Sequence, residues 1–214
     1  MTPRLVILSA PSGGGKTTIA RLLEARRDDM GFSVSATTRP PRAGEQNGVD
    51  YWFLSRSEFL RRTEAGEFLE WAEYAGHLYG TLNSEVDRLL DHGKHVILDI
   101  EVQGAAQVRQ RRVDALAIFI VPPTAEELLR RLTGRRSETR DEVARRIAQA
   151  DRELEAAPAF EHLVVNDDLE RAAAAVGAII DGNSEGAVPP EARAALVASL
   201  RADLRRELDT YGTS

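Results

Sequence analysis

The chain has 214 residues, of which 34 are acidic and 28 are basic, and its formal net charge is −6. This balance differs from the basic composition of nucleic-acid-binding domains, and a chain without cysteine forms neither disulfides nor thiolate metal sites. No apolar stretch is long enough to span a membrane, and the apolar run at Leu5 is too short for a signal peptide. We expect one domain with room for an inserted subdomain, located in the cytoplasm, with neither nucleic-acid nor membrane partners.

The first predicted elements are a strand, a glycine-rich turn and a helix. Residues 5–8 form an apolar run, Pro-Ser-Gly-Gly-Gly follows at 11–15, and apolar residues then recur at helical spacing. This order is the context of a P-loop, in which backbone N–H groups and the positive end of the helix dipole bind phosphate. Lys16 would place its charge at the β- and γ-phosphates, and the Thr17 hydroxyl would ligate Mg²⁺. Ala10 stands where the pattern has glycine.

A second anion site is predicted around Arg39 and Arg42, which flank two prolines that exclude an ordinary helix. Arginine binds phosphate through two parallel hydrogen bonds. An Asn-Gly pair at 47–48 is typical of a hairpin and leads into a predicted strand at 49–54, which would return the Tyr51 hydroxyl to the same phosphate. The alternative is a solvated basic loop before a hairpin. Two phosphate sites in one chain indicate transfer of a phosphoryl group between two phosphate esters.

Apolar strands alternate with helical segments along the rest of the chain. Strands are predicted at 68–74, 95–99, 116–121 and 162–166, and helices after Ser55, at Asn83 or Ser84, after Thr124, after Thr139 and after Asp167. This alternation predicts an α/β fold with a parallel sheet covered by helices on both faces. Ligands in such folds bind at the carboxyl ends of the strands, where the P-loop, Asp99 and Asn166 are located.

The run Ser-x-Thr-Thr-Arg-x-Pro-Arg-x-Gly-Glu-x-x-Gly-x-Asp-Tyr-x-Phe at 35–53 resembles the GMP-binding signature of guanylate kinases. The form Ser-Ala-Pro-Ser-Gly-x-Gly-Lys resembles the P-loop of bacterial members, which accounts for Ala10. The resemblance covers about residues 4–181. It implies a P-loop nucleoside monophosphate kinase fold, with an inserted GMP-binding subdomain and an arginine-rich lid.

The resemblance also implies a division of the chain. A guanylate kinase-like domain would occupy 1–181, followed by a linker and an amphipathic helix at 182–214. Within the domain, the implied segments are a core at 1–34, 82–123 and 151–181, a GMP-binding subdomain at 35–81 and a lid at 124–150.

The implied activity is the Mg²⁺-dependent transfer of the γ-phosphoryl group of ATP to GMP, and to dGMP, giving ADP and GDP. ATP would be bound by Ala10, Pro11, Ser12, Gly13, Gly14, Gly15, Lys16, Thr17, Thr18 and Asn166, with Asn166 on the adenine side. GMP would be bound by Ser35, Arg39, Arg42, Tyr51, Glu70, Tyr79, Gly80, Thr81, Asp99 and Glu101. Lys16, Arg39, Arg131, Arg135 and Arg146 would be catalytic. Thr17 and Asp99 would hold Mg²⁺, directly or through water.

Glu70 is the residue implied to read the base. Guanine presents N1–H and its N2 amino group as parallel donors, and one carboxylate accepts both. Adenine has an acceptor at N1 and would leave that carboxylate unsatisfied. Two positions depart from the family pattern: Glu101 stands where an aspartate is common, and Arg136 replaces a common glycine of the lid.

Residues 182–214 lie outside the resemblance. Leu196, Leu200, Leu204 and Leu208 recur every four residues and form one apolar stripe on a charged helix. This stripe either packs on the chain's own core or serves as a homo-oligomer or partner surface.

Two other functions remain as alternatives. A non-catalytic guanylate-kinase-like binding module would use the GMP region to hold a peptide, but such modules typically lack a P-loop, and Lys16 and Thr17 are present here. A P-loop kinase of another small phosphate acceptor would lack the complete pattern at 35–53.

Overall fold

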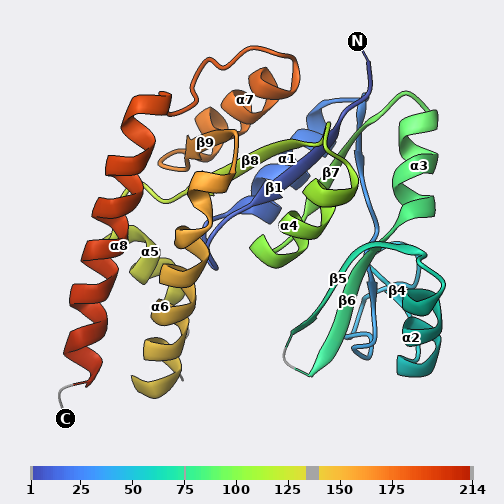
Figure 1. Cartoon of the computed structure of the whole chain (residues 1–214), viewed down its shortest axis with the longest axis horizontal. Helices are drawn as coiled ribbons and strands as arrows, with labels where there is room; N and C mark the ends of the chain where they lie inside the picture. The colour runs from blue at the N-terminus through green and yellow to red at the C-terminus, as the bar shows by residue number, and fades with distance from the viewer. Residues whose placement is uncertain (1, 75, 134–139, 213–214) are drawn as a thin grey trace. The chain divides into compact units, whose positions relative to one another are not determined.

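The computed structural model describes residues 2–74, 76–133 and 140–212, with the side chains of 211 and 212 excepted (Figure 1). The helices are α1 (Lys16–Arg26), α2 (Arg56–Glu64), α3 (Asn83–Asp91), α4 (Val102–Arg111), α5 (Ala125–Leu132), α6 (Arg140–Glu155), the short η1 (Ala157–Ala159), α7 (Leu169–Ile180) and α8 (Pro190–Gly212). The strands are β1 (Leu5–Ser9), β2 (Met30–Phe32), β3 (Ala36–Thr37), β4 (Trp52–Phe53), β5 (Phe68–Tyr74), β6 (His77–Leu82), β7 (His95–Asp99), β8 (Leu116–Val121) and β9 (His162–Val165).

Two sheets organise the fold. The larger has the strand order β2-β7-β1-β8-β9, and its β2–β7 and β8–β9 pairs are parallel. All residues of β1 and β8 are buried, as expected for strands covered on both faces. The smaller sheet has the order β4-β3-β6-β5 and contains antiparallel pairs. The predicted α/β fold, with a parallel sheet flanked by helices and a separate small sheet, is confirmed.

The chain forms two compact units, one of Met1–Ile7 and Glu24–Leu116, the other of Leu8–Leu23 and Ala117–Ser214. In the first unit, the small sheet and α2 enclose an apolar cluster in which the rings of Phe59 and Phe68 stack with centroids 4.2 Å apart. Helix α2 begins as predicted, because the Ser55 side chain accepts a hydrogen bond from the Glu58 N–H.

The hairpin predicted at Asn47-Gly48 is wrong. Strand β4 is only two residues long and pairs in parallel with β3, whereas a hairpin requires antiparallel neighbours. The Asn47 side-chain oxygen accepts the Phe53 N–H at 2.9 Å, and the Gly48 N–H donates to the Tyr51 carbonyl at 2.8 Å. Side-chain hydrogen bonding to the local backbone therefore replaces the strand ladder that the dipeptide predicted.

The remaining predicted helix starts differ in outcome. Thr124 caps α5 by accepting the Glu127 N–H, as predicted. Helix α7 begins one residue later than predicted, since Asp168, and not Asp167, accepts the Arg171 N–H. Thr139 lies outside the described residues. Within the part of the chain that the structure describes, no helix combines the length and apolar character that a membrane span requires.

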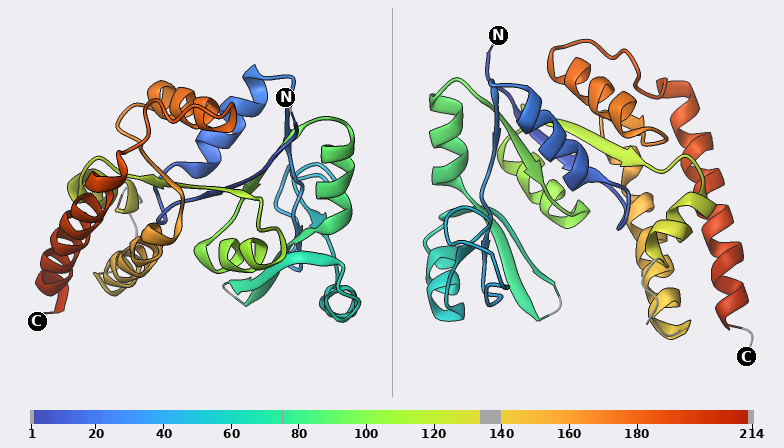
Figure 2. Two further views of the ribbon diagram at one scale, coloured as in Figure 1. Left: turned by 45° about the horizontal axis from the view of Figure 1, so that its top comes forward. Right: turned by 180° about the vertical axis from the view of Figure 1, so that it is seen from behind.

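In the second unit, α8 packs along α6, and both views of Figure 2 show the two helices side by side. The side chains of Val197, Leu200 and Leu204 are buried. Asp151 of α6 accepts hydrogen bonds from Arg201 at 2.7 Å and from Arg205 at 3.1 Å. The apolar stripe of the C-terminal helix is therefore used for packing within the chain.

We expect Asp151→Ala to destabilise this helix pair by about 1–2 kcal/mol, because it removes a shared acceptor from two arginines. Burial opposes ionisation of Asp151, but hydrogen bonds from Arg201 and Arg205 outweigh it and hold the pKa of the carboxyl below its ordinary 3.8. The stabilisation is thus fully present above pH 3.8 and is lost as the pH falls through the lowered pKa. Urea unfolding measures the change. Asp203→Ala is the control, since Asp203 pairs with the exposed Arg206 of its own helix and not with α6 among the described residues. Equal losses in both variants would contradict the prediction.

Candidate functional site

The predicted P-loop connects β1 to α1, and α1 begins at Lys16. The loop closes on itself through the Gly14 N–H, which donates to the Pro11 carbonyl at 2.7 Å. Gly13 and Gly15 have φ angles of +80° and +95°, a conformation that favours glycine. A Cβ on Gly14 would lie 2.8 Å from the Cβ of Ala10. Alanine at position 10 is thus accommodated because the facing residue is glycine.

Two buried side chains of the same unit hold the P-loop from outside. Asn166, directly after β9, donates from Nδ2 to the Gly14 carbonyl at 2.8 Å. Glu153 of α6 accepts the Ser12 N–H at 2.7 Å through Oε2. The Asn166 amide is therefore engaged with the loop backbone, and its contact with adenine stays a prediction. Glu153 is absent from the sequence-based predictions, because an acidic residue in a charged helix indicates a solvated face.

We expect Glu153→Ala to raise the KM for ATP about tenfold, because the Ser12 N–H loses its acceptor and the loop becomes less ordered. The KM for GMP should change less than twofold. Initial-rate kinetics with each nucleotide varied in turn measures both values. Glu153→Gln keeps an acceptor oxygen and should recover most of the affinity, and Glu155→Ala on the same helix serves as the exposed control. An equal rise in both KM values would refute a specific role at the P-loop.

The structure describes only some of the arginines predicted for the lid. Arg131 of α5 donates through Nε to Glu127 at 2.7 Å and through a terminal nitrogen to the Asn166 carbonyl at 3.1 Å. Hydrogen bonds from Arg130 and Arg131 lower the pKa of Glu127 to about 2. Arg146 lies on α6 and is half-buried, whereas Arg135, like Arg136, lies outside the described residues. Arg131 is thus fixed beside the residue that supports the P-loop.

The other predicted half-site belongs to the first unit and is built around Glu70. Its side chain is 5% exposed, and its Oε1 accepts the Thr81 hydroxyl at 2.7 Å. The two residues face each other because β5 and β6 pair antiparallel with Glu70 opposite Thr81. Burial raises the pKa of the Glu70 carboxyl, against the opposing effects of Thr81 and the positive charge of Arg111. A buried carboxylate held by a hydroxyl can accept donors from a planar base.

A cluster of Arg39, Tyr51 and Tyr79 forms the predicted phosphate end of this half-site. The Arg39 guanidinium carbon lies 5.3 Å from the centre of the Tyr51 ring, and the Tyr51 and Tyr79 rings are 6.2 Å apart. Arg39 also pairs with Glu45 at 2.8 Å. Burial raises the pKa of Tyr51, the electrostatic effects of Tyr79 and Asp99 add to the rise, and the positive charge of Arg39 opposes it. The structure therefore brings together three of the residues predicted to bind GMP.

The other predicted GMP ligands occupy varied positions. Arg42 is exposed, and its backbone N–H donates to Glu45 at 2.7 Å. Ser35 is half-buried, and its carbonyl accepts the Trp52 N–H. Gly80 is buried in β6, where a Cβ would lie 2.8 Å from the Glu70 carbonyl. Glu101 is the N-cap residue of α4. Glu45, which orders the arginine loop, is a functional candidate that the sequence-based list lacks.

The chemistry of Thr17 and Asp99 fits Mg²⁺. Thr17 is exposed on the first turn of α1, and Asp99 is half-buried at the carboxyl end of β7. Mg²⁺ prefers oxygen ligands and usually takes one or two from protein, completing its shell with substrate phosphates and water. Among residues 2–74, 76–133 and 140–212 there is no cluster of three or more potential metal-ligating side chains. Binding of Mg²⁺ by either side chain would accordingly depend on the nucleotide.

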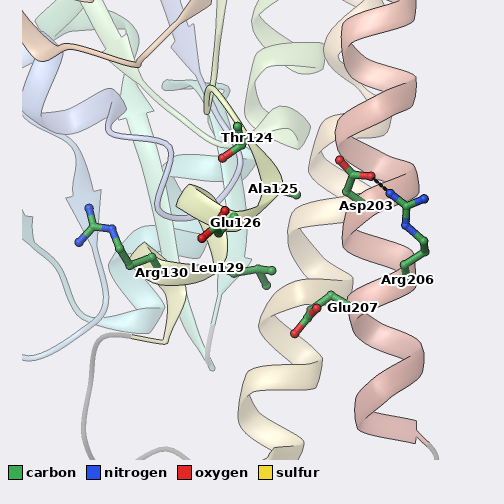
Figure 3. Close-up of a pocket in the computed structure, with 8 residues that line it drawn as sticks. All are labelled: Thr124, Ala125, Glu126, Leu129, Arg130, Asp203, Arg206 and Glu207. Atoms are coloured by element: carbon green, nitrogen blue, oxygen red, sulfur yellow. Dashed lines mark hydrogen bonds and ion pairs between the residues drawn. The ribbon is translucent and has the colours of Figure 1, made fainter.

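A separate pocket lies between α5 and α8 (Figure 3). Its volume is about 620 Å³. It is lined by Thr124, Ala125, Glu126, Leu129, Arg130, Asp203, Arg206 and Glu207. Asp203 and Arg206 form an ion pair on α8. Since this lining includes none of the predicted site residues that the structure describes, the pocket does not belong to either half-site.

Comparison with known proteins assigns the family. Residues 2–183 match the family described as guanylate kinase. The guanylate kinase of Synechococcus sp. (strain JA-3-3Ab) is 48% identical over 183 residues, which cover 86% of this chain and 84% of the relative. That of Rubrobacter xylanophilus is 53% identical over 169 residues, covering 79% and 88%. The crystal structure of guanylate kinase from Anaplasma phagocytophilum superposes with a TM-score of 0.69 at 31% identity, covering 90% of this chain and 93% of that one. The chain belongs to the guanylate kinase family.

Proposed function

We infer that this chain transfers the γ-phosphoryl group of ATP to GMP, giving ADP and GDP. The observation that carries the choice of acceptor is Glu70, a buried carboxylate that accepts the Thr81 hydroxyl. Guanine offers two parallel donors to such a carboxylate, whereas adenine places an acceptor there. Family membership over residues 2–183 supports an enzyme and favours neither a binding module nor a kinase of another phosphate ester.

The residues of the chain supply alignment and charge neutralisation. An oxygen of the GMP phosphate, already anionic, forms a bond to the γ-phosphorus while the bond from that phosphorus to ADP breaks, so no general base is required. Lys16, the P-loop N–H groups and the arginines Arg39, Arg131, Arg135 and Arg146 neutralise charge on the transferring group. Mg²⁺, held by Thr17 and Asp99 directly or through water, would supply further neutralisation of the phosphate oxygens.

We propose that 35–81 acts as the GMP-binding subdomain and 124–150 as a lid, and that both close on a core of 1–34, 82–123 and 151–181. Closure excludes water, which would otherwise hydrolyse ATP without an acceptor. Small-angle scattering should then give a smaller radius of gyration with GMP and a non-hydrolysable ATP analogue than without nucleotide. Identical profiles would contradict closure.

The magnesium requirement is tested by titrating Mg²⁺ in a coupled ADP-release assay. We expect ADP release with GMP to stop when the ion is chelated and to return when it is restored. Thr17→Ala should shift the half-maximal Mg²⁺ concentration upwards, whereas Thr17→Ser keeps the hydroxyl and should leave it near the wild-type value. Equal shifts in both variants would exclude the hydroxyl as a ligand.

Three finer proposals accompany this function. dGMP should be accepted with GMP, which the same assay measures. We expect an enzyme that acts on free ATP and GMP to be located in the cytoplasm, which cell fractionation tests. A homo-oligomer through α8 has the least support, because Val197, Leu200 and Leu204 are buried within the chain. Light scattering should accordingly give a mass near 23.5 kDa.

A further inference from the structure

Helix α4 packs against β5, the strand that carries Glu70. Three of its residues, Gly104, Gln107 and Arg111, follow one another at spacings of three and four and so lie on one helix face. All three face the segment of β5 around Glu70. No motif of the sequence assigns a function to this face.

Gln107 binds the backbone of β5 on one side of Glu70. Its Oε1 accepts the Trp71 N–H at 3.2 Å, and its Nε2 donates to the Trp71 carbonyl at 2.8 Å. Strand β5 is at the edge of the small sheet, where backbone groups face no further strand. The side-chain amide therefore takes the place of a neighbouring strand for the residue that follows Glu70.

Arg111 binds the backbone on the other side of Glu70. One of its terminal nitrogens donates to the carbonyls of Phe68 and Leu69, both at 2.6 Å. The pairing register of β5 with β6 shifts between Phe68 and Glu70, which marks a bulge. Bulges disrupt the strand ladder and redirect side chains. Arg111 thus binds the carbonyls at the irregularity that determines the direction of the Glu70 side chain.

Gly104 leaves room for the carboxylate itself. A Cβ at this position would lie 2.5 Å from Glu70 Oε2 and 3.1 Å from its carboxyl carbon. Glycine inside a helix is less favourable than alanine. Its place in α4 is explained by the space it leaves for Oε2, while Oε1 is held by Thr81.

We propose that Gly104, Gln107 and Arg111 are positioning residues for guanine selectivity, which fix the carboxylate of Glu70 in the orientation that reads the base. The proposal rests on the proposed function, in which Glu70 accepts the guanine donors. Gly104 limits the position of one carboxylate oxygen, and the other two residues hold the strand on either side.

Gly104→Ala is the most direct test, because it separates positioning from folding. The helix propensity of alanine offsets the cost of displacing the carboxylate, so the variant should stay folded with a melting temperature close to the wild-type value. The added methyl displaces the carboxylate, so the KM for GMP should rise about 10- to 100-fold, while kcat at saturating GMP and the KM for ATP stay within about twofold. Gln103→Ala, on an exposed position of the same helix, is the control and should leave all three values unchanged. An unchanged KM for GMP in Gly104→Ala would overturn the proposal.

A double-mutant cycle with Glu70→Ala distinguishes this inference from the function on which it rests. If Glu70→Ala leaves the KM for GMP unchanged, the proposed reading of guanine fails. If Glu70→Ala raises it and Gly104→Ala does not, only the role of α4 fails. We expect Gly104→Ala to add nothing in the Glu70→Ala background, since no carboxylate remains to be displaced. Full additivity would mean that the methyl acts through some other part of the structure, and would also overturn the proposal.

Arg111→Ala and Arg111→Lys provide an independent measurement. Removal of the guanidinium leaves two carbonyls of β5 without this donor, and the KM for GMP should rise about tenfold. Lysine retains a donor at one point and should recover part of the affinity. A fall in melting temperature in both variants with no change in the ratio of the KM values for GMP and ATP would assign Arg111 to stability alone.

Discussion

Lys16→Ala is expected to reduce kcat by about 10³-fold. Lys16 is the first residue of α1 and follows directly on the glycines of the P-loop. In the proposed mechanism its ammonium group neutralises charge that develops on the transferring phosphoryl group, which a neutral side chain cannot do. Since this interaction strengthens in the transition state, kcat should fall far more than the KM for either nucleotide rises. Steady-state rates of ADP release with ATP and GMP give both quantities.

The sequence offers a matched control for this substitution. Lys94 is the only other lysine in the chain. It lies directly before β7 and is not one of the predicted site residues, so Lys94→Ala should retain the wild-type rate. Comparable losses in the two variants, or a folded Lys16→Ala variant with wild-type kcat, would contradict the assignment of the P-loop.

Glu70→Ala should lower kcat/KM for GMP by about 10²- to 10³-fold, because two charge-assisted hydrogen bonds to the base are lost together. The kcat/KM for AMP should not fall, since adenine forms no favourable hydrogen bond with the carboxylate at N1. The ratio of kcat/KM for GMP to kcat/KM for AMP therefore decreases in the variant. Glu73→Ala is the control, because Glu73 lies on the same strand but is exposed and pairs with Arg56.

The pH dependence provides a second measurement of the same group. Burial raises the pKa of Glu70 above its ordinary 4.5, so the carboxyl becomes protonated at a higher pH than an exposed glutamate would. Protonation replaces an acceptor with a donor, and kcat/KM for GMP should fall as the pH decreases through the raised pKa. Glu70→Gln should remove this decrease of kcat/KM at low pH. If the decrease at low pH persists in the variant, the titrating group is another residue.

Strands with strong apolar runs were predictable from the sequence. Residues 95–99 and 116–121 form β7 and β8 with the predicted bounds, because a continuous buried apolar run is evident without tertiary context. Residues 68–74 also form β5 as predicted, although this strand lies at the edge of the small sheet and is buried only in its first half. The P-loop and the capping residues Ser55 and Thr124 are equally local, since their hydrogen bonds join residues a few positions apart. Arg39 and Tyr51 followed from the anion site predicted at 39–51, and Tyr79 followed from the family resemblance.

The missed features depend on contacts between distant segments. Helix α4 has few large apolar residues, so no apolar stripe at helical spacing marks it, and its internal glycine lowers its helix propensity. Its function depends on Glu70, 34 positions before Gly104, through a contact that no spacing predicts. Glu153 reaches Ser12 across 141 positions. The Asn47-Gly48 pair failed as a hairpin because the Asn47 side chain bonds to the Phe53 N–H.

The most direct test of the central claim is the rate of ADP release by the wild-type chain with ATP, Mg²⁺ and each of GMP, AMP, CMP and UMP in turn. We predict rapid release with GMP and rates at least about 10²-fold lower with the other three acceptors. Comparable rates with GMP and AMP would contradict the reading of guanine by Glu70. The absence of ADP release with all four acceptors in a folded protein would contradict the phosphoryl transfer itself.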